Sequence, residues 1–263
     1  MSSRPETPSA VVTGSSSGIG LGIAESFAAA GMNVMMNGIE PTEDIAPIAD
    51  RLAETHGVKT AYEPANLMEP DGARALIASA EAAFGQVDVL VNNAGIQFVS
   101  PVEDFPDDKW HAIIALNLSS AFFTTKAAMA GMKTRGWGRI INISSAHGLV
   151  ASPFKTAYVA AKHGIIGLTK TVAMEGAEHG ITANAICPGY VWTPLVEKQI
   201  PETAKARGIT EDEVKRDVLL AVQPTKEFAT TEQIGGLATF LCSPAADNMT
   251  GTSLPVDGGW TAH

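Results

Sequence analysis

Cysteine is nearly absent from this sequence of 263 residues, in which Cys187 and Cys242 are the two present. Two cysteines exclude a disulfide framework and a four-cysteine zinc site. Aromatic residues make up only 6% of the chain and charged residues 17%, whereas hydrophobic residues make up 45%. This composition excludes a mostly disordered chain, and the length allows one large domain with a substantial core. Cys187 lies between an apolar run and a proline, so we interpret it as a small buried hydrophobic residue rather than a nucleophile.

Basic residues are also scarce, since 18 Lys and Arg residues stand against 28 Asp and Glu residues, a formal net charge of −10. No block of the sequence is rich in Lys or Arg, which argues against nucleic acid or an anionic membrane as a partner. No uninterrupted apolar run has membrane-spanning length, and residues 1–9 are polar, with no apolar stretch of signal-peptide length. We therefore expect a soluble, cytoplasmic, globular protein with no nucleic-acid and no membrane partner.

Short apolar runs alternate with longer stretches rich in alanine, leucine and charge along the whole chain. The longer stretches predict helices, among them 19–30, 71–84 and 110–135. The short runs predict strands at 10–13, 33–37, 87–92, 139–144, 181–187 and 253–256 and, more weakly, at 60–63.

The predicted strands are continuous apolar runs rather than alternating ones, which is typical of a parallel sheet covered by helices on both faces. About seven such strands predict an α/β fold, a single-domain Rossmann-type doubly wound parallel sheet over residues 1–263. The segment of about 188–230 is interrupted by Pro194, Pro201 and Pro224. We interpret it as a substrate lid; the alternative is a surface excursion without function.

A glycine-rich loop, T-G-S-S-S-G-I-G, follows the first predicted strand at residues 13–20 and leads directly into a helix. Pyrophosphate must approach the backbone N–H groups of a helix N-terminus without Cβ atoms in the way. Gly14 is expected to allow the tight turn, Gly18 the close approach of the ligand, and Gly20 the packing of helix against strand. The spacing differs from G-x-G-x-x-G, but the position at the first βα turn favours a dinucleotide site.

The sequence after the second predicted strand favours NAD over NADP. Gly38 occupies the position where an acidic residue would bind the ribose diol, so the usual anchor is missing. However, residues 33–50 contain no Lys or Arg, whereas Glu40, Glu43, Asp44 and Asp50 are acidic. A 2′-phosphate would find no cation here, and we expect NAD as the cofactor.

A candidate catalytic group follows the strand at 139–144. Tyr158 and Lys162 are four residues apart on a predicted helix and share one face, downstream of Ser145. An ammonium about 4 Å from the phenol oxygen would stabilise the phenolate by roughly 4 kcal/mol, lowering the tyrosine pKa by about three units. Ser145 is then expected to hold the substrate oxygen while Tyr158 exchanges its proton.

These features occur together with N-N-A-G at 92–95, at the end of the fourth predicted strand, 87–92. In this combination the sequence resembles the short-chain dehydrogenase/reductases from Ala10 to Trp260. The resemblance implies that Tyr158 is the general acid/base and that Lys162 is its partner and bridges to the nicotinamide ribose. It also implies that Ser145 positions the substrate and that Asn117 completes a proton relay through water.

The resemblance further implies which residues bind the cofactor. In this family an aspartate often stands where this chain has Asn66, next to the adenine, and we expect a modest effect because Asn66 still forms hydrogen bonds. The asparagines at 92–93 are also expected to cap and pack the turn. The expected cofactor residues are Gly14, Ser16, Ser17, Gly18, Ile19, Gly20, Asn66, Leu67, Asn93, Ala94, Gly95, Tyr158, Lys162, Pro188, Gly189, Val191 and Thr193.

Residues 93–97, 145–150, 155–162, 187–200 and 257–260 look more specifically like bacterial members of this family that oxidise (R)-3-hydroxybutyrate to acetoacetate with NAD. A small hydroxy acid needs an anchor for its carboxylate, and Lys155 is the expected one, although a lysine near a helix start is often only solvated. Tyr190 is expected to pack over substrate or nicotinamide, or else to be a lid-core aromatic. The expected substrate residues are Gln97, His147, Lys155, Tyr190 and Gln199.

Two alternatives stay open at this point. One keeps the chemistry but changes the substrate to another 3-hydroxy acid, a sugar or a 3-oxoacyl group. The other is an inactive NAD-binding regulator, against which the complete set of Ser145, Tyr158 and Lys162 argues. The resemblance also implies a homotetramer, formed by helix pairing and by the C-terminal segment 258–260. No cluster of metal ligands is visible, and we expect no metal.

Overall fold

The computed structural model describes residues 4–262, in which seven parallel strands form one sheet in the order β3-β2-β1-β4-β5-β6-β7. The expectations about the polar N-terminus therefore lie partly outside the described residues. Each predicted strand is confirmed, with ends that differ by at most two residues. The strands are β1 (Ser9–Val12), β2 (Asn33–Asn37), β3 (Thr60–Glu63), β4 (Val89–Asn92), β5 (Gly138–Ile143), β6 (Ile181–Pro188) and β7 (Ser253–Val256).

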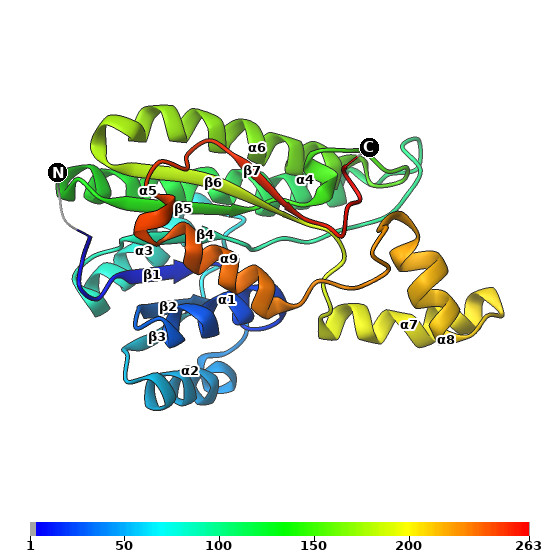
Figure 1. Cartoon of the computed structure of the whole chain (residues 1–263), viewed down its shortest axis with the longest axis horizontal. Coiled ribbons are helices and arrows are strands. Elements are labelled where there is room, and N and C mark those ends of the chain that lie inside the picture. The colour runs from blue at the N-terminus through cyan, green and yellow to red at the C-terminus, as the bar shows by residue number, and fades with distance from the viewer. Residues whose placement is uncertain (1–3, 263) are drawn as a thin grey trace.

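Helices alternate with the strands and cover the sheet (Figure 1). The α-helices are α1 (Gly18–Ala29), α2 (Thr42–His56), α3 (Pro70–Phe84), α4 (Asp107–Ile114), α5 (Ser120–Arg135), α6 (Thr156–Gly176), α7 (Pro194–Arg207), α8 (Glu211–Glu213) and α9 (Thr231–Leu241). Short π or 3₁₀ segments are η1 (Ala115–Ser119), η2 (Ala146–Gly148), η3 (Ala177–His179), η4 (Val214–Leu219), η5 (Leu220–Val222) and η6 (Pro244–Ala246).

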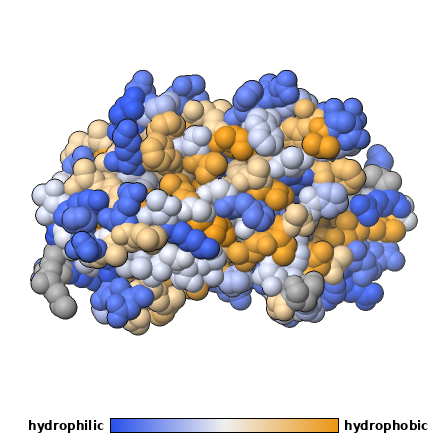
Figure 2. All heavy atoms as spheres, turned by 90° about the horizontal axis from the view of Figure 1, so that it is seen from above, coloured by the Kyte–Doolittle hydropathy of each residue, from blue (hydrophilic) through white to orange (hydrophobic). Residues whose placement is uncertain are grey.

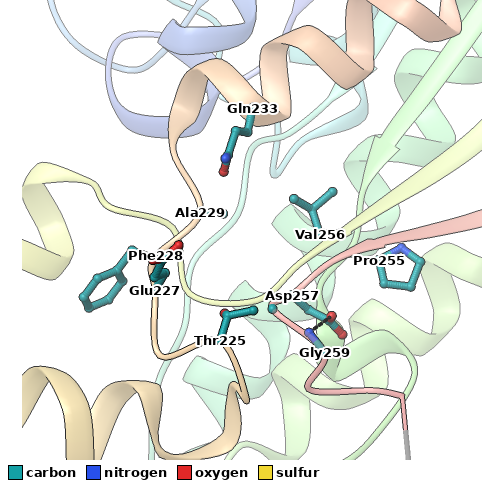
Figure 3. A pocket seen from close by; sticks show the side chains of 10 residues that line it. Thr225, Glu227, Phe228, Ala229, Gln233, Pro255, Val256, Asp257 and Gly259 are labelled. Carbon is teal, nitrogen blue, oxygen red and sulfur yellow. Dashed lines mark hydrogen bonds between the residues drawn. The ribbon is translucent and has the colours of Figure 1, made fainter.

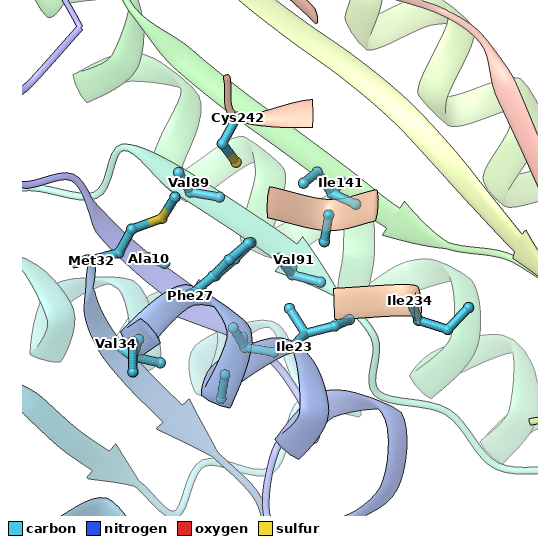
Figure 4. Packing of buried hydrophobic residues seen from close by; sticks show 14 of the residues in the cluster. Ala10, Ile23, Phe27, Met32, Val34, Val89, Val91, Ile141, Ile234 and Cys242 are labelled. Atoms are coloured by element: carbon cyan, nitrogen blue, oxygen red, sulfur yellow. The ribbon is translucent and has the colours of Figure 1, made fainter. Parts of the chain in front are cut away.

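The two faces of the sheet bury alternate residues of the same strands, because successive side chains point to opposite faces. On one face Val89 and Val91 of β4 pack with Ile23 and Phe27 of α1 and with Ile234 of α9. Figure 4 shows these side chains converging between the helices and the strands. The continuous apolar runs of the sequence are therefore strands covered on both faces, as predicted.

The other face is covered by α3, α5 and α6. Here the intervening strand residues, Val11 of β1 and Leu90 of β4, pack with Leu76 of α3, Met132 of α5 and Val172 of α6. Each side chain of this group is almost completely buried. The two layers hold the sheet rigidly enough to position groups at its carboxyl edge.

The chain reverses its direction across the sheet at β1, which pairs with β2 on one side and β4 on the other. The strands from β1 to β3 extend in one direction and those from β4 to β7 in the other. At such a switch point the loops after the two central strands separate and open a crevice, the usual ligand site of this architecture. The loops after β1 and β4 are the two that carry the glycine-rich and N-N-A-G sequences.

The helix predicted at 110–135 is a longer helical stretch, Asp107–Arg135, interrupted by the π turn η1. By length and composition alone this stretch could cross a membrane. In the fold, however, α5 packs on α3 and on strands β4 and β5, and α4 packs on α6. It is a covering helix of the sheet, which explains its apolar composition.

Candidate functional site

The loop between β1 and α1 brings two backbones closer than side chains would allow. Gly14 and Gly18 adopt positive φ angles of 60° and 56°. A Cβ atom on Gly14 would lie 2.9 Å from the Cα of Ala94, and one on Gly20 would collide with the carbonyl oxygen of Gly14. The tight turn and the helix packing predicted for Gly14 and Gly20 are therefore present, and neither position has room for a Cβ atom.

The loops after β1 and β4 are joined by four hydrogen bonds. The backbone N–H groups of Asn93 and Ala94 donate to Thr13 Oγ1 at 2.9 and 3.0 Å. Asn93 Nδ2 donates to the carbonyl oxygens of Thr13 and Gly14 at 3.0 and 2.9 Å. Asn93 thus holds the glycine-rich turn, the structural role expected beside its predicted cofactor contact. Gly95 follows at the surface, and a Cβ there would lie 3.3 Å from Asn117 Oδ1.

Helix α1 begins at Gly18, and its N-cap residue Ser17 forms no capping hydrogen bond with its side chain. The first N–H groups of a helix have no intrahelical partner and, with the helix dipole, attract a phosphate. Ile19 points away from this end and packs against the core. Ser16 Oγ donates to Glu40 Oε1 at 2.9 Å, a contact that the sequence did not predict.

The predicted adenine residues follow β3. Asn66 is exposed, and its Oδ1 accepts a hydrogen bond of 3.0 Å from the N–H of Met68. Leu67 is buried in the core. Asn37 ties this region to the phosphate loop, because it accepts from Gly14 N at 3.3 Å and donates to the carbonyl oxygen of Ala65 at 3.1 Å. Sequence reasoning missed Asn37, since only the folded sheet brings its partners together.

Ser145, Tyr158 and Lys162 are brought together at the carboxyl end of β5. Ser145 Oγ accepts from His147 N at 3.1 Å and donates to the carbonyl oxygen of Pro188 at 3.5 Å. Tyr158 lies in the first turn of α6 and shares a hydrogen bond with Ser145. The ammonium of Lys162 lies 5.5 Å from the centre of the Tyr158 ring, on the face predicted from their spacing.

Burial of Tyr158 opposes the lowering of its pKa that is expected from Lys162, and that lowering stays a prediction. Burial raises the pKa of Tyr158 above 10, and the hydrogen bond from Ser145 opposes this only in part. Burial also lowers the pKa of Lys162 to about 8. The Lys162 ammonium donates to the carbonyl oxygen of Ile143 at 2.7 Å. This carbonyl is the hydrogen-bond partner that holds the ammonium beside the Tyr158 ring.

Asn117 lies in the π turn η1 and is buried. Its Oδ1 accepts from Ile96 N at 2.8 Å and its Nδ2 donates to Ile96 O at 2.9 Å. The side chain therefore ties the helix to the loop after β4. A π turn within an α-helix often marks a functional site. The proton relay predicted for Asn117 stays a prediction.

His147 is buried at the centre of an aromatic cluster. Its ring stands edge-on to Tyr158 at 6.0 Å and to Trp260 at 4.8 Å, and Trp260 stacks on Tyr190 at 5.9 Å. His147 Nε2 shares a hydrogen bond of 2.8 Å with Ser152 Oγ. The cluster places the predicted residues His147 and Tyr190 beside the catalytic group. Sequence reasoning missed Trp260 as a site residue, because it is about 100 positions from Tyr158 along the chain.

Trp260 is held in place by the side chain of Asp257. The Asp257 carboxylate accepts from Gly259 N at 3.0 Å, from Thr261 N at 2.9 Å and from Thr261 Oγ1 at 2.6 Å. Figure 3 shows the first of these bonds at the end of β7. The turn is therefore fixed on both sides of the tryptophan.

Lys155 is the N-cap residue of α6 and is partly buried, which lowers its pKa. Its charge helps to lower the pKa of the His147 imidazole, a smaller effect than burial. Gln97, after β4, and Gln199, on α7, are exposed. Within the described part of the chain, neither glutamine forms a hydrogen bond with another predicted substrate residue.

The two roots of the predicted lid are joined by Gln223, which is 1% exposed. Its Oε1 accepts from Tyr190 N at 2.5 Å and its Nε2 donates to Glu227 O at 2.7 Å. Val191 forms a β-bridge with Ala229. Sequence reasoning missed Gln223, because its burial and its contact with Tyr190 appear only in the folded chain.

Figure 1 shows α7 and α8 standing beside the main body, beyond these roots. A pocket of about 300 Å³ lies where Thr193 and Trp192 face Gly18 and Gly22 of α1. A second, of about 330 Å³, lies between the lid root and the end of β7 and is lined by residues that include Thr225, Gln233 and Asp257 (Figure 3). Of the predicted residues, Thr193 thus lies beside the phosphate loop.

Two further expectations concern residues without a catalytic role. Cys187 is fully buried, and burial raises the pKa of its thiol to about 11, as expected of a small hydrophobic residue. Within residues 4–262 no group of three or more His, Cys, Asp or Glu side chains lies close enough together to hold a metal ion. His263 lies outside the described residues.

Comparison with known proteins gives matches over nearly the whole chain. The sequence profile of a family described as enoyl-(acyl carrier protein) reductase matches residues 14–261. The chain belongs to the short-chain dehydrogenase/reductase family. Its alternating α/β fold and the placement of Ser145, Tyr158 and Lys162 agree with this membership, so the chain is an oxidoreductase.

Individual members of the short-chain dehydrogenase/reductase family resemble the chain to different degrees. A protein of Rhizobium meliloti named D-beta-hydroxybutyrate dehydrogenase is 55% identical over 98% of this chain and all of the relative. A protein of the same name from Cupriavidus necator is 50% identical over 97% of this chain and 98% of the relative. A 2-dehydro-3-deoxy-D-gluconate 5-dehydrogenase of Bacillus subtilis is 37% identical over 97% of this chain.

The burial of His147 makes the stability of the fold sensitive to acid. Burial, with smaller contributions from the charges of Lys155 and His163, lowers the pKa of His147 from 6.5 to about 4. The unfolded chain therefore binds a proton at this position at a higher pH than the folded one. The contribution of His147 to the free energy of unfolding is present above pH 6.5 and is lost as the pH falls towards 4, by at most about 3 kcal/mol.

We expect the urea midpoint of the wild-type protein to fall more steeply between pH 6.5 and 4 than that of the His147→Gln variant. The exposed His179, in η3, gives the matched control, and His179→Gln is expected to retain the wild-type slope. Equal slopes for the wild type and His147→Gln would contradict the assignment.

Proposed function

We propose that the protein catalyses the reversible oxidation of (R)-3-hydroxybutyrate to acetoacetate with NAD. The observation that carries the proposal is the cluster of Ser145, Tyr158, His147 and Trp260, with Lys155 at its edge. This cluster combines a proton-exchanging group, a cation for a carboxylate and an apolar wall for a short carbon chain. The two relatives named D-beta-hydroxybutyrate dehydrogenase support the same substrate.

The residues around the switch point fit a dinucleotide. Gly14, Gly18 and Gly20 form a backbone cradle at the start of α1, where the pyrophosphate would be held. The loop after β4, with Asn93 and Ala94, forms the opposite wall of the crevice. NAD, when bound, would supply the hydride acceptor. We propose that the predicted cofactor residues of the lid root, Pro188, Gly189, Val191 and Thr193, would cover its nicotinamide half.

In the proposed reaction Tyr158 exchanges the proton of the substrate hydroxyl. During oxidation the O–H proton would move to the Tyr158 oxygen while the carbonyl forms and the carbinol carbon gives up its hydrogen as a hydride, for which NAD would supply the acceptor. Burial raises the pKa of Tyr158 and so favours the protonated phenol, the form that acts as the acid in the reverse reduction. Oxidation is therefore expected to speed up as the pH rises.

Ser145 and Lys162 support this exchange in different ways. Ser145 shares a hydrogen bond with Tyr158, so its hydroxyl is placed to hold the same substrate oxygen. The Lys162 ammonium, fixed on the Ile143 carbonyl, supplies a buried positive charge under the tyrosine ring. We propose that Asn117, which shapes the neighbouring π turn, continues the proton path through water.

The carboxylate of the substrate is proposed to bind Lys155. The N-terminus of α6 adds its helix dipole at this position, so a carboxylate meets two sources of positive potential. His147, neutral at pH 7, offers a hydrogen bond rather than a charge. Gln97 and Gln199 are proposed to complete the site when the segment 188–230 closes as a lid.

The first test compares the two enantiomers of 3-hydroxybutyrate as substrates. With NAD present, we expect the R form to give NADH, measured by absorbance, at a rate well above that of the S form. Tyr158→Phe, which lacks the exchanging oxygen, is expected to lower kcat by at least about 100-fold. No turnover of the R form, or a preference for S, would overturn the substrate assignment; unchanged activity in Tyr158→Phe would favour the inactive-regulator alternative for the site.

The second test concerns the carboxylate anchor. Replacing Lys155 by Ala is expected to lower kcat/KM for 3-hydroxybutyrate by about 10- to 100-fold, since a hydrogen bond to a charged group contributes about 1.5–3 kcal/mol. A neutral secondary alcohol of the same length is expected to lose much less. Lys198→Ala, at an exposed position of α7, is the matched control and should match the wild type. Equal losses on acid and alcohol would contradict the anchor.

We further propose that the protein is a homotetramer. Trp110, Phe122 and Met174, on α4, α5 and α6, are exposed, and such apolar side chains are usual at subunit contacts. Figure 2 shows hydrophobic side chains gathered along the middle of the face seen from above Figure 1. The C-terminal segment expected to join subunits is in part committed to the site, because Trp260 is buried there.

Light scattering is expected to give a mass of about 110 kDa, four times the 27.4 kDa of the chain. A mass of one chain would contradict the tetramer.

We also propose, from the sequence, that the protein is soluble and cytoplasmic and that residues 1–263 form one domain. A longer 3-hydroxy acid, a sugar or a 3-oxoacyl group stays the alternative substrate, to be assayed in the same panel.

A further inference from the structure

The side chain of Glu40 folds back from the loop after β2 onto the phosphate loop. Its Oε1 accepts a hydrogen bond of 2.9 Å from Ser16 Oγ, and its Oε2 accepts one of 3.0 Å from the N–H of Ile39. Its backbone carbonyl accepts from Tyr62 OH of β3 at 2.8 Å. Side chain and backbone are thus both fixed, and the carboxylate stands beside the loop that carries Gly14 and Gly18.

Gly38 provides the space for this arrangement. A Cβ atom at position 38 would collide with Glu40 Oε2 and would lie 2.9 Å from Tyr62 OH and 3.3 Å from the Cβ of Ser16. A side chain at position 38 and the carboxylate of Glu40 would therefore occupy the same space, so the chain can carry only one of them there. The sequence shows the loss of the anchor, whereas the structure shows a second carboxylate in its place.

We propose that Glu40 is the residue that selects NAD over NADP, by accepting a hydrogen bond from the 2′-hydroxyl of the adenosine ribose. An acidic group at the end of the second strand, next to the pyrophosphate loop, is the usual partner of this hydroxyl. Glu40 reaches the same place from two residues further along. The inference rests on the proposed use of a nicotinamide dinucleotide by this chain.

The local charge supports exclusion of a 2′-phosphate. Burial acts to raise the pKa of Glu40. Hydrogen bonds from its own backbone N–H, from Ser16 and from Ile39 lower the pKa by more, so the net pKa of the carboxyl lies below its ordinary value. The carboxylate is therefore ionised at neutral pH. Residues 33–50 include no Lys or Arg to offset it, so a 2′-phosphate would meet a fixed like charge.

The decisive experiment measures binding of dinucleotides without any hydroxy acid. Isothermal titration of the whole protein with NAD, NADP and 2′-deoxy-NAD gives three dissociation constants for each variant. We expect wild-type protein to bind NAD at least about 10- to 100-fold more tightly than the other two, the range of a lost hydrogen bond to a charged group. In Glu40→Ala the preference for NAD over 2′-deoxy-NAD should vanish, and NADP binding should strengthen.

Two further variants separate the contact from its surroundings. Glu40→Gln keeps the shape and removes the charge, so NADP binding is expected to strengthen while the hydrogen bond to the ribose is partly retained. Glu43→Gln removes a neighbouring exposed charge of α2 and is expected to leave the three constants unchanged. Equal binding of NAD and NADP by the wild type would overturn the proposal, as would a 2′-deoxy penalty that persists in Glu40→Ala.

The wild-type comparison of NAD with 2′-deoxy-NAD involves no substitution and so does not depend on the folding of a variant. Failure of this inference and failure of the substrate proposal are also distinguishable. Dinucleotide discrimination that depends on Glu40 supports the inference even where (R)-3-hydroxybutyrate is not oxidised. Rapid oxidation of that substrate with NAD and NADP alike would leave the substrate proposal standing and overturn the role of Glu40.

Discussion

The contact between the loops after β1 and β4 is the constraint on which the rest of the site depends. Thr13 and Asn93 join these loops with hydrogen bonds through both backbone and side chains. The glycines allow the two backbones to approach each other. The order in which strands are added to the sheet reverses at the same point, between β1 and β4. One loop leads to the dinucleotide half and the other to the catalytic half. A fixed distance between them is what places a hydride acceptor opposite a proton-exchanging group.

Burial governs the chemistry of the catalytic half. The same removal from water raises the pKa of Tyr158 and lowers the pKa of Lys162, so each group is displaced toward its neutral form. The protein compensates with single directed contacts, the Ile143 carbonyl for the ammonium and Ser145 for the phenol. A charge brought by a ligand therefore acts in a medium of low polarity, where its effect on proton transfer is large.

The sequence was sufficient to predict the seven strands, the glycine-rich turn and the pairing of Tyr158 with Lys162, because these depend on apolar runs and helical spacing. It was not sufficient for Trp260 or Gln223, whose partners come from distant segments. For Tyr158 the sequence suggests the neighbouring charge of Lys162 but not the depth of burial, which acts on the pKa in the opposite direction. For Glu40 the composition revealed the acidic loop, and only the folded chain shows where its carboxylate lies.

The π turn at Ala115–Ser119 changes the direction in which the side chains after it point. Ile113 and Met132, both buried, are 19 residues apart. At about 3.6 residues per turn this separation is about 5.3 turns, which would put the two side chains roughly 100° apart around the axis. A π turn takes up about one extra residue, and the remaining 18 make about five whole turns. The widened turn therefore rotates α5 by about 100° relative to an unbroken α-helix. It thereby sets which side chains each part buries: Ile113 packs with Ala157 and Ala161 of α6, and Met132 packs in the core between the sheet and its covering helices.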